Sequence, residues 1–423
     1  MNWVKCEAKA IGKTVNWHCL VWVLLLGLGQ SEADAGDWPQ ILGPNRNGVA
    51  EGEKLLASWP AAGPKLVWER AVGSGFAGVA VADGKAVLFH RVGNEEVVEA
   101  MQADTGRVLW KQTFATDYTS QIPSDSGPRC VPVLHDGMAY LYGSGGNLHA
   151  VKLATGEKVW TRTLLQDFEG SEGYFGAGST PLVMSEKLLV NVGGKGAGIV
   201  ALDPKSGKTV WKGTDEQASY SSPMAAQLLG KPVAVFITRL NLVVIEPMTG
   251  KVLFTKPFGA RGPTVNGANP LVLGDHIFLS ASYGVGASWC HVTATGLNAV
   301  WENDDTLSSQ YPTAVHNQGI LFGIHGRQDI GLAALRAIDP KQGKVLWSQE
   351  QFGMACPILA DGKILLPKTS GELVLAEANP QRFAELASAT LFNSTVQALP
   401  ALSHGLLYLR DTQTLKCLEV GKR

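Results

Sequence analysis

ALDPKSGKTVW, at residues 201–211, returns almost unchanged as AIDPKQGKVLW at residues 337–347. Looser copies of this unit occur at four further places: 100–110, 150–160, 244–254 and 293–301. The aromatic residues that close the units, with one more upstream, are spaced by 42, 50, 51, 43, 47 and 46 residues: Trp68, Trp110, Trp160, Trp211, Phe254, Trp301 and Trp347. Such a regular period indicates a repeat architecture.

A proline recurs with the same spacing and marks the start of each unit: Pro132, Pro181, Pro223, Pro270, Pro312, Pro357 and Pro400. After each proline comes a short apolar run, usually a turn such as Asp136-Gly137, and then two further apolar runs. Runs joined by tight turns predict four strands, which we call a to d, linked by hairpins. Because proline cannot donate a hydrogen bond within a central strand, strand a has a free edge.

The number of units predicts a closed ring. Sets of strands a, b and c begin near eight residues: Ala77, Arg129, Ser179, Ser221, Ala268, Tyr311, Ala355 and Gln397. The first d strand, at residues 66–70, precedes every a strand, and the last unit, ending near Val420, lacks a d strand of its own. We therefore predict an all-β, eight-bladed β-propeller over residues 66–420, with four-stranded antiparallel blades and a ring closed by the N-terminal strand, which completes the last blade. Phe383 stands where the seventh blade should have tryptophan.

Residues 1–35 have the composition of a secretory signal peptide. Three lysines precede the apolar run at 19–29, and Ala33-Asp34-Ala35 matches the small-x-small pattern of a cleavage site. The apolar run is shorter than the ~20 residues that a membrane-spanning helix needs. We expect cleavage after Ala35, an extracytoplasmic location, periplasmic or secreted, and no membrane span afterwards. Residues 36–65 then form an N-terminal segment ahead of the propeller.

Charge and cysteine content exclude several functional classes. The 423 residues carry 36 Lys plus Arg against 37 Asp plus Glu, which lacks the basic excess typical of nucleic-acid-binding proteins. The cysteines beyond residue 35 form no Cys-x-x-Cys pair, so we expect free, buried thiols: Cys130, Cys290, Cys356 and Cys417. Four histidines fall in or beside a-b turns of different blades, so we expect no metal site from them: His135, His276, His316 and His404.

The repeat resembles a known family. Ala-x-Asp-x-x-Thr/Ser-Gly-x-x-x-Trp is similar to the tryptophan-docking repeat of pyrroloquinoline quinone (PQQ)-type propellers, which occur in quinoprotein alcohol dehydrogenases and in the scaffold lipoprotein of outer-membrane protein assembly. The stretch at residues 37–48, beginning Asp37-Trp38-Pro39-Gln40, resembles the lead segment of exported PQQ-like propellers. The resemblance implies a fold and not an activity, because one fold hosts many functions.

Long connections between strands d and a place the working surface on one face of the ring. They run from 111 to 128, 161 to 178, 255 to 267 and 302 to 310, and loops longer than a hairpin requires are where function concentrates. Six residues enter strand a from this face and are our candidate ligand- or partner-binding residues: Arg129, Thr180, Tyr220, Ser222, Asn269 and Tyr311. An arginine meets anions, and tyrosines stack on flat ligands or peptides. The alternative is that small polar side chains merely line a water-filled channel.

No catalytic residues are predicted, and the chain is expected to be an exported, non-catalytic propeller that binds an envelope protein or a small ligand. One alternative is a PQQ-dependent alcohol or sugar dehydrogenase, for which the resemblance implies a calcium ion, a catalytic Asp and commonly a vicinal Cys pair. Adjacent cysteines are absent, and no acid precedes the strand-a prolines. A second alternative is a carbohydrate-binding or carbohydrate-degrading propeller, whose degrading form needs two facing carboxylates.

Overall fold

The computed structural model describes residues 35–121, 125–171, 173–262 and 264–422. The predicted signal peptide therefore lies almost wholly outside the described residues. The described part contains one short helix, α1 (Leu164–Asp167), and otherwise strands and turns. Among these residues, no helix combines the length and the apolar character that crossing a bilayer would require.

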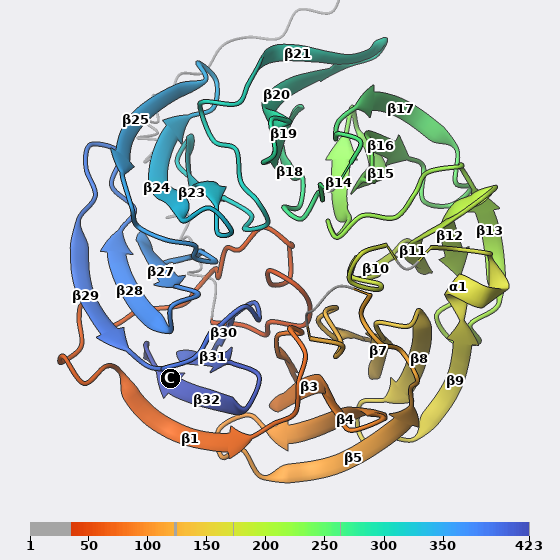
Figure 1. Cartoon of the computed structure of the whole chain (residues 1–423), viewed down its shortest axis with the longest axis horizontal. Helices are drawn as coiled ribbons and strands as arrows, with labels where there is room; N and C mark the ends of the chain where they lie inside the picture. The colour runs from red at the N-terminus through yellow and green to blue at the C-terminus, as the bar shows by residue number, and fades with distance from the viewer. Residues whose placement is uncertain (1–34, 122–124, 172, 263, 423) are drawn as a thin grey trace, which may run out of the picture. The chain divides into compact units, whose positions relative to one another are not determined.

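Eight four-stranded antiparallel sheets follow one another around a ring, which confirms the predicted eight-bladed propeller (Figure 1). The first four blades are, in order, β2 (Ala80–Ala82), β3 (Lys85–Val92), β4 (Glu95–Gln102), β5 (Val108–Ala115); β6 (Val133–His135), β7 (Met138–Tyr142), β8 (Asn147–Lys152), β9 (Lys158–Thr163); β10 (Leu182–Met184), β11 (Lys187–Gly194), β12 (Ala197–Leu202), β13 (Thr209–Gly213); and β14 (Met224–Leu228), β15 (Lys231–Ile237), β16 (Asn241–Ile245), β17 (Val252–Pro257).

The other four blades complete the ring. They are β18 (Leu271–Leu273), β19 (His276–Ala281), β20 (Gly286–Thr293), β21 (Gly296–Asn303); β22 (Val315–Asn317), β23 (Ile320–Arg327), β24 (Leu332–Asp339), β25 (Lys344–Gln349); β26 (Ile358–Ala360), β27 (Lys363–Pro367), β28 (Glu372–Glu377), β29 (Glu385–Thr390); and β30 (Ala401–Ser403), β31 (Leu406–Arg410), β32 (Thr414–Glu419), β1 (Lys65–Ala71).

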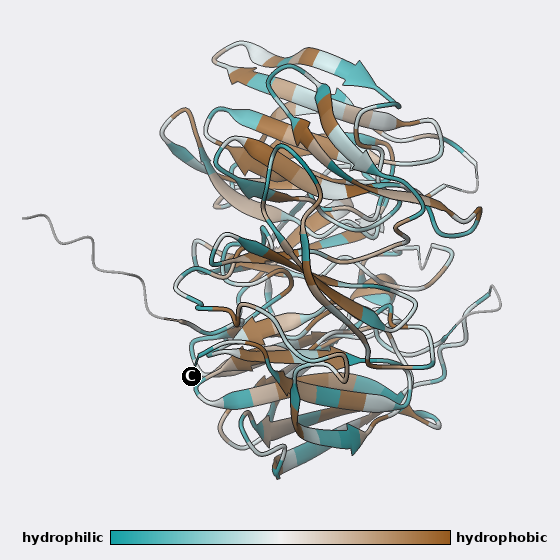
Figure 2. Cartoon of the chain, turned by 90° about the vertical axis from the view of Figure 1, so that its left-hand side faces the viewer, coloured by the Kyte–Doolittle hydropathy of each residue, from teal (hydrophilic) through white to brown (hydrophobic). Residues whose placement is uncertain are grey.

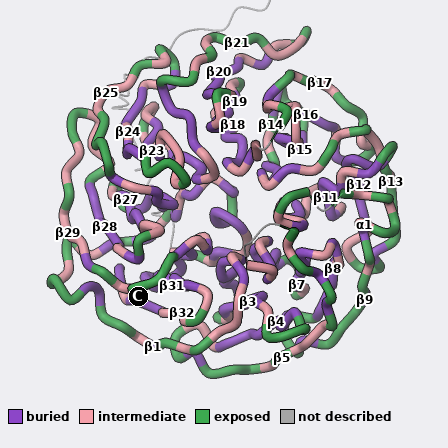
Figure 3. Tube along the Cα trace, in the orientation of Figure 1, coloured by how far each residue is buried: buried purple, intermediate pink, exposed green. Residues whose placement is uncertain are grey.

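Strand position within a blade decides burial. The first three strands of each blade are mostly buried, whereas the outermost strands alternate between exposed and half-buried residues (Figure 3). The brown, hydrophobic stretches in Figure 2 accordingly lie along the strands inside the blades. Since both faces of each inner strand meet a neighbouring sheet, the strands read as continuous apolar runs instead of alternating ones.

An indole joins most neighbouring blades. The Trp110 Nε1 donates to the Leu153 carbonyl oxygen of the next blade at 2.9 Å, and its ring lies against Gly156 in the same c-d turn. A Cβ at Gly156 would come within 2.4 Å of this ring, so only glycine leaves room for it. Five further indoles donate to a turn carbonyl in the next blade in the same way, namely Trp68, Trp160, Trp211, Trp301 and Trp347.

A β-bulge turns each indole inward. In the first blade, Ala100 pairs with Trp110 and Met101 with Val108, so Leu109 is left out of the pairing. The same register shift occurs between the last two strands of every blade. Because the extra residue is pushed outward, apolar side chains next to the indoles are exposed, with Val300 at 52%.

Strand β1 closes the ring by pairing with β32, as predicted. Trp68 on β1 makes the same contact as the other indoles, because its Nε1 donates to the Ala103 carbonyl oxygen of the first blade at 3.0 Å. The prediction for Phe383 was wrong in detail. Ala387, paired with Leu375, occupies the tryptophan position of the seventh blade. Phe383 instead packs against Trp347 of the sixth blade, with 6.1 Å between the ring centroids.

The N-terminal segment crosses the centre of the ring, where Figure 1 shows it in red and orange. Trp38 pairs with Val81 of the first blade, Val49 with Leu359 of the seventh, and Leu55 with Gly421 of the eighth. These contacts lie toward the a-b turns, so the segment closes the channel on that side. We call this side the lower face and the side of the d-to-a loops the upper face.

Arg46 anchors the segment inside the channel. Its guanidinium is 1% exposed and donates to the carbonyl oxygens of Thr180 (3.2 Å), Pro223 (2.9 Å) and Pro181. Its Nε donates to the Gln40 side chain at 2.8 Å. None of the carboxylates in the described residues forms an ion pair with it, and burial lowers the pKa of Arg46 to about 9.

Replacing Trp301 by Ala should lower the free energy of unfolding by about 3–5 kcal/mol, because the packing on Gly343 and the bond to the Pro340 carbonyl oxygen are both lost. Urea denaturation measures the difference. Val300→Ala is the matched control, since this adjacent residue is exposed and should change stability by no more than about 0.5 kcal/mol. Equal losses in the two variants would contradict the role of the indole.

Arg46→Ala should destabilise the protein by about 3 kcal/mol or more, because three buried carbonyl oxygens lose their donor. Thermal unfolding followed by circular dichroism gives the comparison. Arg107→Ala, at an exposed turn, serves as the control and should leave the melting temperature unchanged. An unchanged melting temperature in Arg46→Ala would show that the N-terminal segment does not brace the ring.

Candidate functional site

A cup opens on the upper face at the mouth of the channel. Its volume is about 680 Å³, within the range of small-molecule sites. Ile41 and Leu42 of the N-terminal segment contribute to its lining, and both are buried. The walls come from the starts of strands a and from the upper loops, including Phe76, Arg129, Phe175, Tyr220, Asn269, Tyr283, Gln310, Tyr311, Gln328 and Asp329.

Arg129 is held rigidly in the wall of the cup. Its guanidinium carbon lies 5.5 Å from the ring centroid of Phe76 and 5.7 Å from that of Phe175, within the range of cation–π contacts. The guanidinium also donates to the backbone carbonyl oxygens of Gly127 (3.1 Å) and Asp125 (2.6 Å). Burial lowers the pKa of Arg129, but an arginine remains charged at neutral pH. The wall of the cup therefore holds a guanidinium group in a fixed position.

Two tyrosines line the cup, and the hydroxyl group of each forms a hydrogen bond within the protein. The Tyr220 hydroxyl accepts a hydrogen bond from the Phe175 backbone N–H at 2.6 Å, and the Tyr311 hydroxyl donates to the Gln328 side chain at 2.7 Å. Burial raises the pKa of both phenols, so they stay neutral. The rings are thereby oriented for contact with an apolar or flat group in the cup.

Thr180 and Ser222 are not in the cup lining; with Asn269 they join consecutive blades. The Thr180 N–H donates to the Ser222 hydroxyl at 2.9 Å, and the Ser222 N–H donates to the Asn269 side-chain oxygen at 2.8 Å. The Asn269 N–H in turn donates to the Thr313 hydroxyl of the next blade at 2.9 Å. We predicted that Thr180 and Ser222 face a ligand. The structure places both residues in the interior with no exposed area, and a ligand contact stays a prediction. Arg129, Tyr220, Asn269 and Tyr311 do line a common space.

Sequence reasoning missed one side of the rim. Arg327 stacks over Tyr283 at 4.2 Å and donates to the Asp329 carboxylate at 3.0 Å. Gln310 donates to the Tyr283 hydroxyl at 2.8 Å. Apart from Gln310, these residues lie on b-c hairpins, which reach the same face as the d-to-a loops. The order of the strands predicts that the b-c hairpins lie on this face, whereas the length of the loops does not.

Known proteins with the same repeat are similar to this chain. A family model described as outer membrane protein assembly factor BamB matches residues 93–349. The chain belongs to this family. BamB of Burkholderia pseudomallei strain K96243 is 25% identical over 293 residues, which are 59% of this chain and 71% of that protein. The BamB crystal structure from Moraxella catarrhalis covers 84% of this chain and 99% of its own, with 16% identity and a TM-score of 0.62.

Quinoprotein dehydrogenases share the fold of this BamB-family chain. Quinoprotein alcohol dehydrogenase PedH of Pseudomonas putida strain KT2440 is 28% identical over 135 residues, which are 29% of this chain and only 21% of that protein. Quinohemoprotein alcohol dehydrogenase from Comamonas testosteroni covers 93% of this chain and 82% of its own, with 17% identity and a TM-score of 0.53. Likeness at this level shows a common architecture.

The cup of this BamB-family chain does not fit a calcium–quinone pair. Calcium takes six to eight oxygen ligands, usually including several carboxylates. Asp329 is the one carboxylate among the described residues that line the cup, and Arg327 already engages it. The described cysteines are buried and distant from one another in sequence, so none supplies a vicinal pair. The described residues that line the cup therefore do not supply the donor set that a quinone dehydrogenase requires.

Proposed function

We propose that this protein is exported after loss of residues 1–35 and acts as a non-catalytic propeller that binds an envelope protein through its upper face. The cup carries this proposal. It presents aromatic rings, amide groups and the Arg129 guanidinium at the centre of the ring, while the N-terminal segment pairs with blades toward the opposite mouth. Membership in the BamB family supports a protein partner, because the relatives are named as assembly factors.

Charge in the cup favours one kind of partner segment. Arg129 contributes a cation, and the Asp329 carboxylate is neutralised by Arg327. Arg46, below the cup, adds a second buried cation without a carboxylate partner in the described residues. A segment that inserts an aromatic or aliphatic side chain and carries an acidic group is complementary to this lining.

Arg129→Ala and Tyr311→Ala should each weaken capture of the envelope partner, because each removes a group from the wall of the cup. The measurement is a pull-down from envelope extract with quantification of bound proteins. Arg107→Ala, at a c-d turn on the lower face, provides the matched loss of one positive charge and should retain the same partners. Circular dichroism verifies that all variants are folded, and capture unaffected by both cup substitutions would exclude this face.

Incubation with PQQ and CaCl₂ should give no stoichiometric quinone binding and no dye-linked oxidation of alcohols, since the described residues that line the cup include a single carboxylate. Quinone absorbance after gel filtration measures binding. Tight binding with turnover would replace the scaffold proposal by the dehydrogenase alternative. The carbohydrate-degrading alternative faces the same obstacle, because glycoside hydrolysis uses two carboxylates and the described lining of the cup offers one.

A further inference from the structure

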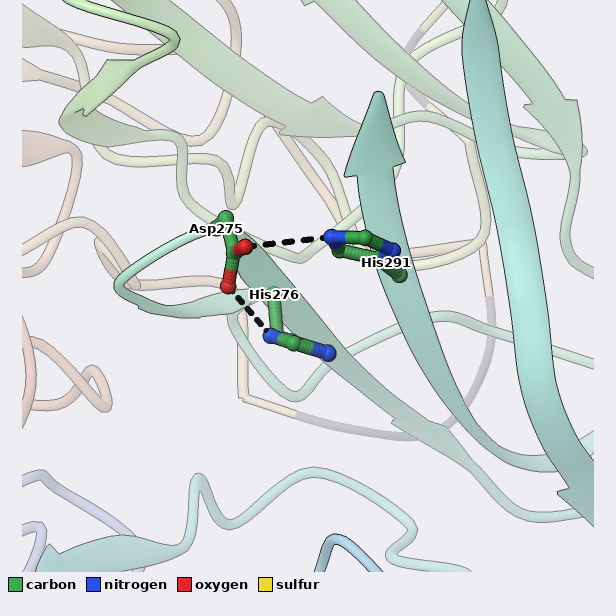
Figure 4. Close-up of side chains that lie close together, drawn as sticks. All are labelled: Asp275, His276 and His291. Carbon is green, nitrogen blue, oxygen red and sulfur yellow. Dashed lines mark hydrogen bonds and ion pairs between the residues drawn. The ribbon is translucent and has the colours of Figure 1, made fainter.

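Three side chains of metal-ligating type meet on the lower face of the fifth blade (Figure 4). Asp275 lies in the turn between β18 and β19, His276 begins β19, and His291 on β20 is directly opposite His276 in the antiparallel register. One Asp275 oxygen lies 2.6 Å from the His276 Nδ1, and the other lies 3.0 Å from the His291 Nε2. The two oxygens of a single carboxylate thus contact one nitrogen of each imidazole ring.

The spacing of the donor atoms is close to that of a metal site. One ligand atom from each residue lies within 4.8 Å of the other two, and the described residues contain no second group of three or more such side chains. Tetrahedral zinc with bonds of about 2.0–2.1 Å places its ligand atoms about 3.3 Å apart. Reaching that spacing would lengthen the 2.6 Å contact of Asp275 with His276 by about 0.7 Å and its 3.0 Å contact with His291 by about 0.3 Å.

Ring stacking determines which ligand must move. The His276 ring stacks on Trp289 at 4.9 Å and 14°, and on His291 at 4.8 Å and 19°. Two parallel rings do not direct their in-plane lone pairs at a common ion, so one ring has to rotate. Trp289 is buried and holds His276, whereas the His291 side chain is 42% exposed and bonds only to Asp275 among the described residues. His291 is therefore the ligand that rotates.

We propose that Asp275, His276 and His291 form a surface site for a late first-row divalent cation such as Zn²⁺, with the remaining coordination position open to water. Two imidazole nitrogens and one carboxylate oxygen suit such a cation better than Ca²⁺ or Mg²⁺, which prefer oxygen ligands. Our expectation of no metal site considered only histidines at a-b turns. The second imidazole comes from the neighbouring strand.

Isothermal titration of the purified protein, free of a polyhistidine tag, with ZnCl₂ should give one binding site, and titration with CaCl₂ should give none there. His291→Ala should weaken Zn²⁺ binding about tenfold or more, because one of three ligands is lost. His135→Ala is the matched control. His135 lies 3.5 Å from Asp136 at the corresponding turn of the second blade, and no second imidazole joins that pair among the described residues.

Two outcomes would overturn the proposal: no stoichiometric Zn²⁺ binding by the unmodified protein, or equal affinity in His291→Ala. A second measurement replaces Zn²⁺ by Co²⁺, whose visible absorption should appear with the unmodified protein and be lost in His291→Ala. Circular dichroism checks that His291→Ala is folded, which its exposed position favours.

Discussion

The indole that lies on the next blade's c-d turn is the interaction on which the ring depends. A four-stranded blade has two apolar faces that it cannot bury by itself, so it depends on packing against neighbouring blades. Six indoles each join two blades by packing on a turn and donating one hydrogen bond to it. Because Trp68 makes this contact across the closure, the ring is joined at its ends by the same interaction that joins its middle.

Junctions without an indole show what else can hold blades together. Phe254 has no N–H to donate, and a Cβ added at Gly296 in the next turn would meet no atom within 4 Å, so no ring packs there. Lys256 and Glu302 instead form an ion pair at 2.6 Å between the same two blades. At the seventh blade, where Ala387 replaces the indole, Trp59 of the N-terminal segment packs on the same hydrophobic cluster as Ala387. The N-terminal segment thus adds contacts where the repeat is weakest.

The sequence predicted the number of blades and the closure of the ring, which follow from the repeat. It did not predict contacts between residues that are far apart in the chain and meet only in the folded protein. Periodic tryptophans and a d strand ahead of the first a strand were enough to predict eight blades and their closure. The partners of Arg46 are backbone carbonyl oxygens at positions 134 to 177 residues away, and a carbonyl has no residue-specific signal. Thr180 was placed on the correct strand start, but the direction of its side chain depends on the neighbouring blade. His291 was missed because pairing across β19 and β20 brings it to His276.

The cup and the cluster of Asp275 with two histidines lie on opposite faces of the ring. The cup and its aromatic walls belong to the upper face, whereas Asp275 and the two histidines lie beside a turn of the lower face. The N-terminal segment, anchored by Arg46, crosses the channel and pairs with the first, seventh and eighth blades. The cup is built from loops and hairpin ends that lie outside the tryptophan-docking repeat. The proposed metal site and the proposed partner-binding cup therefore share no residues.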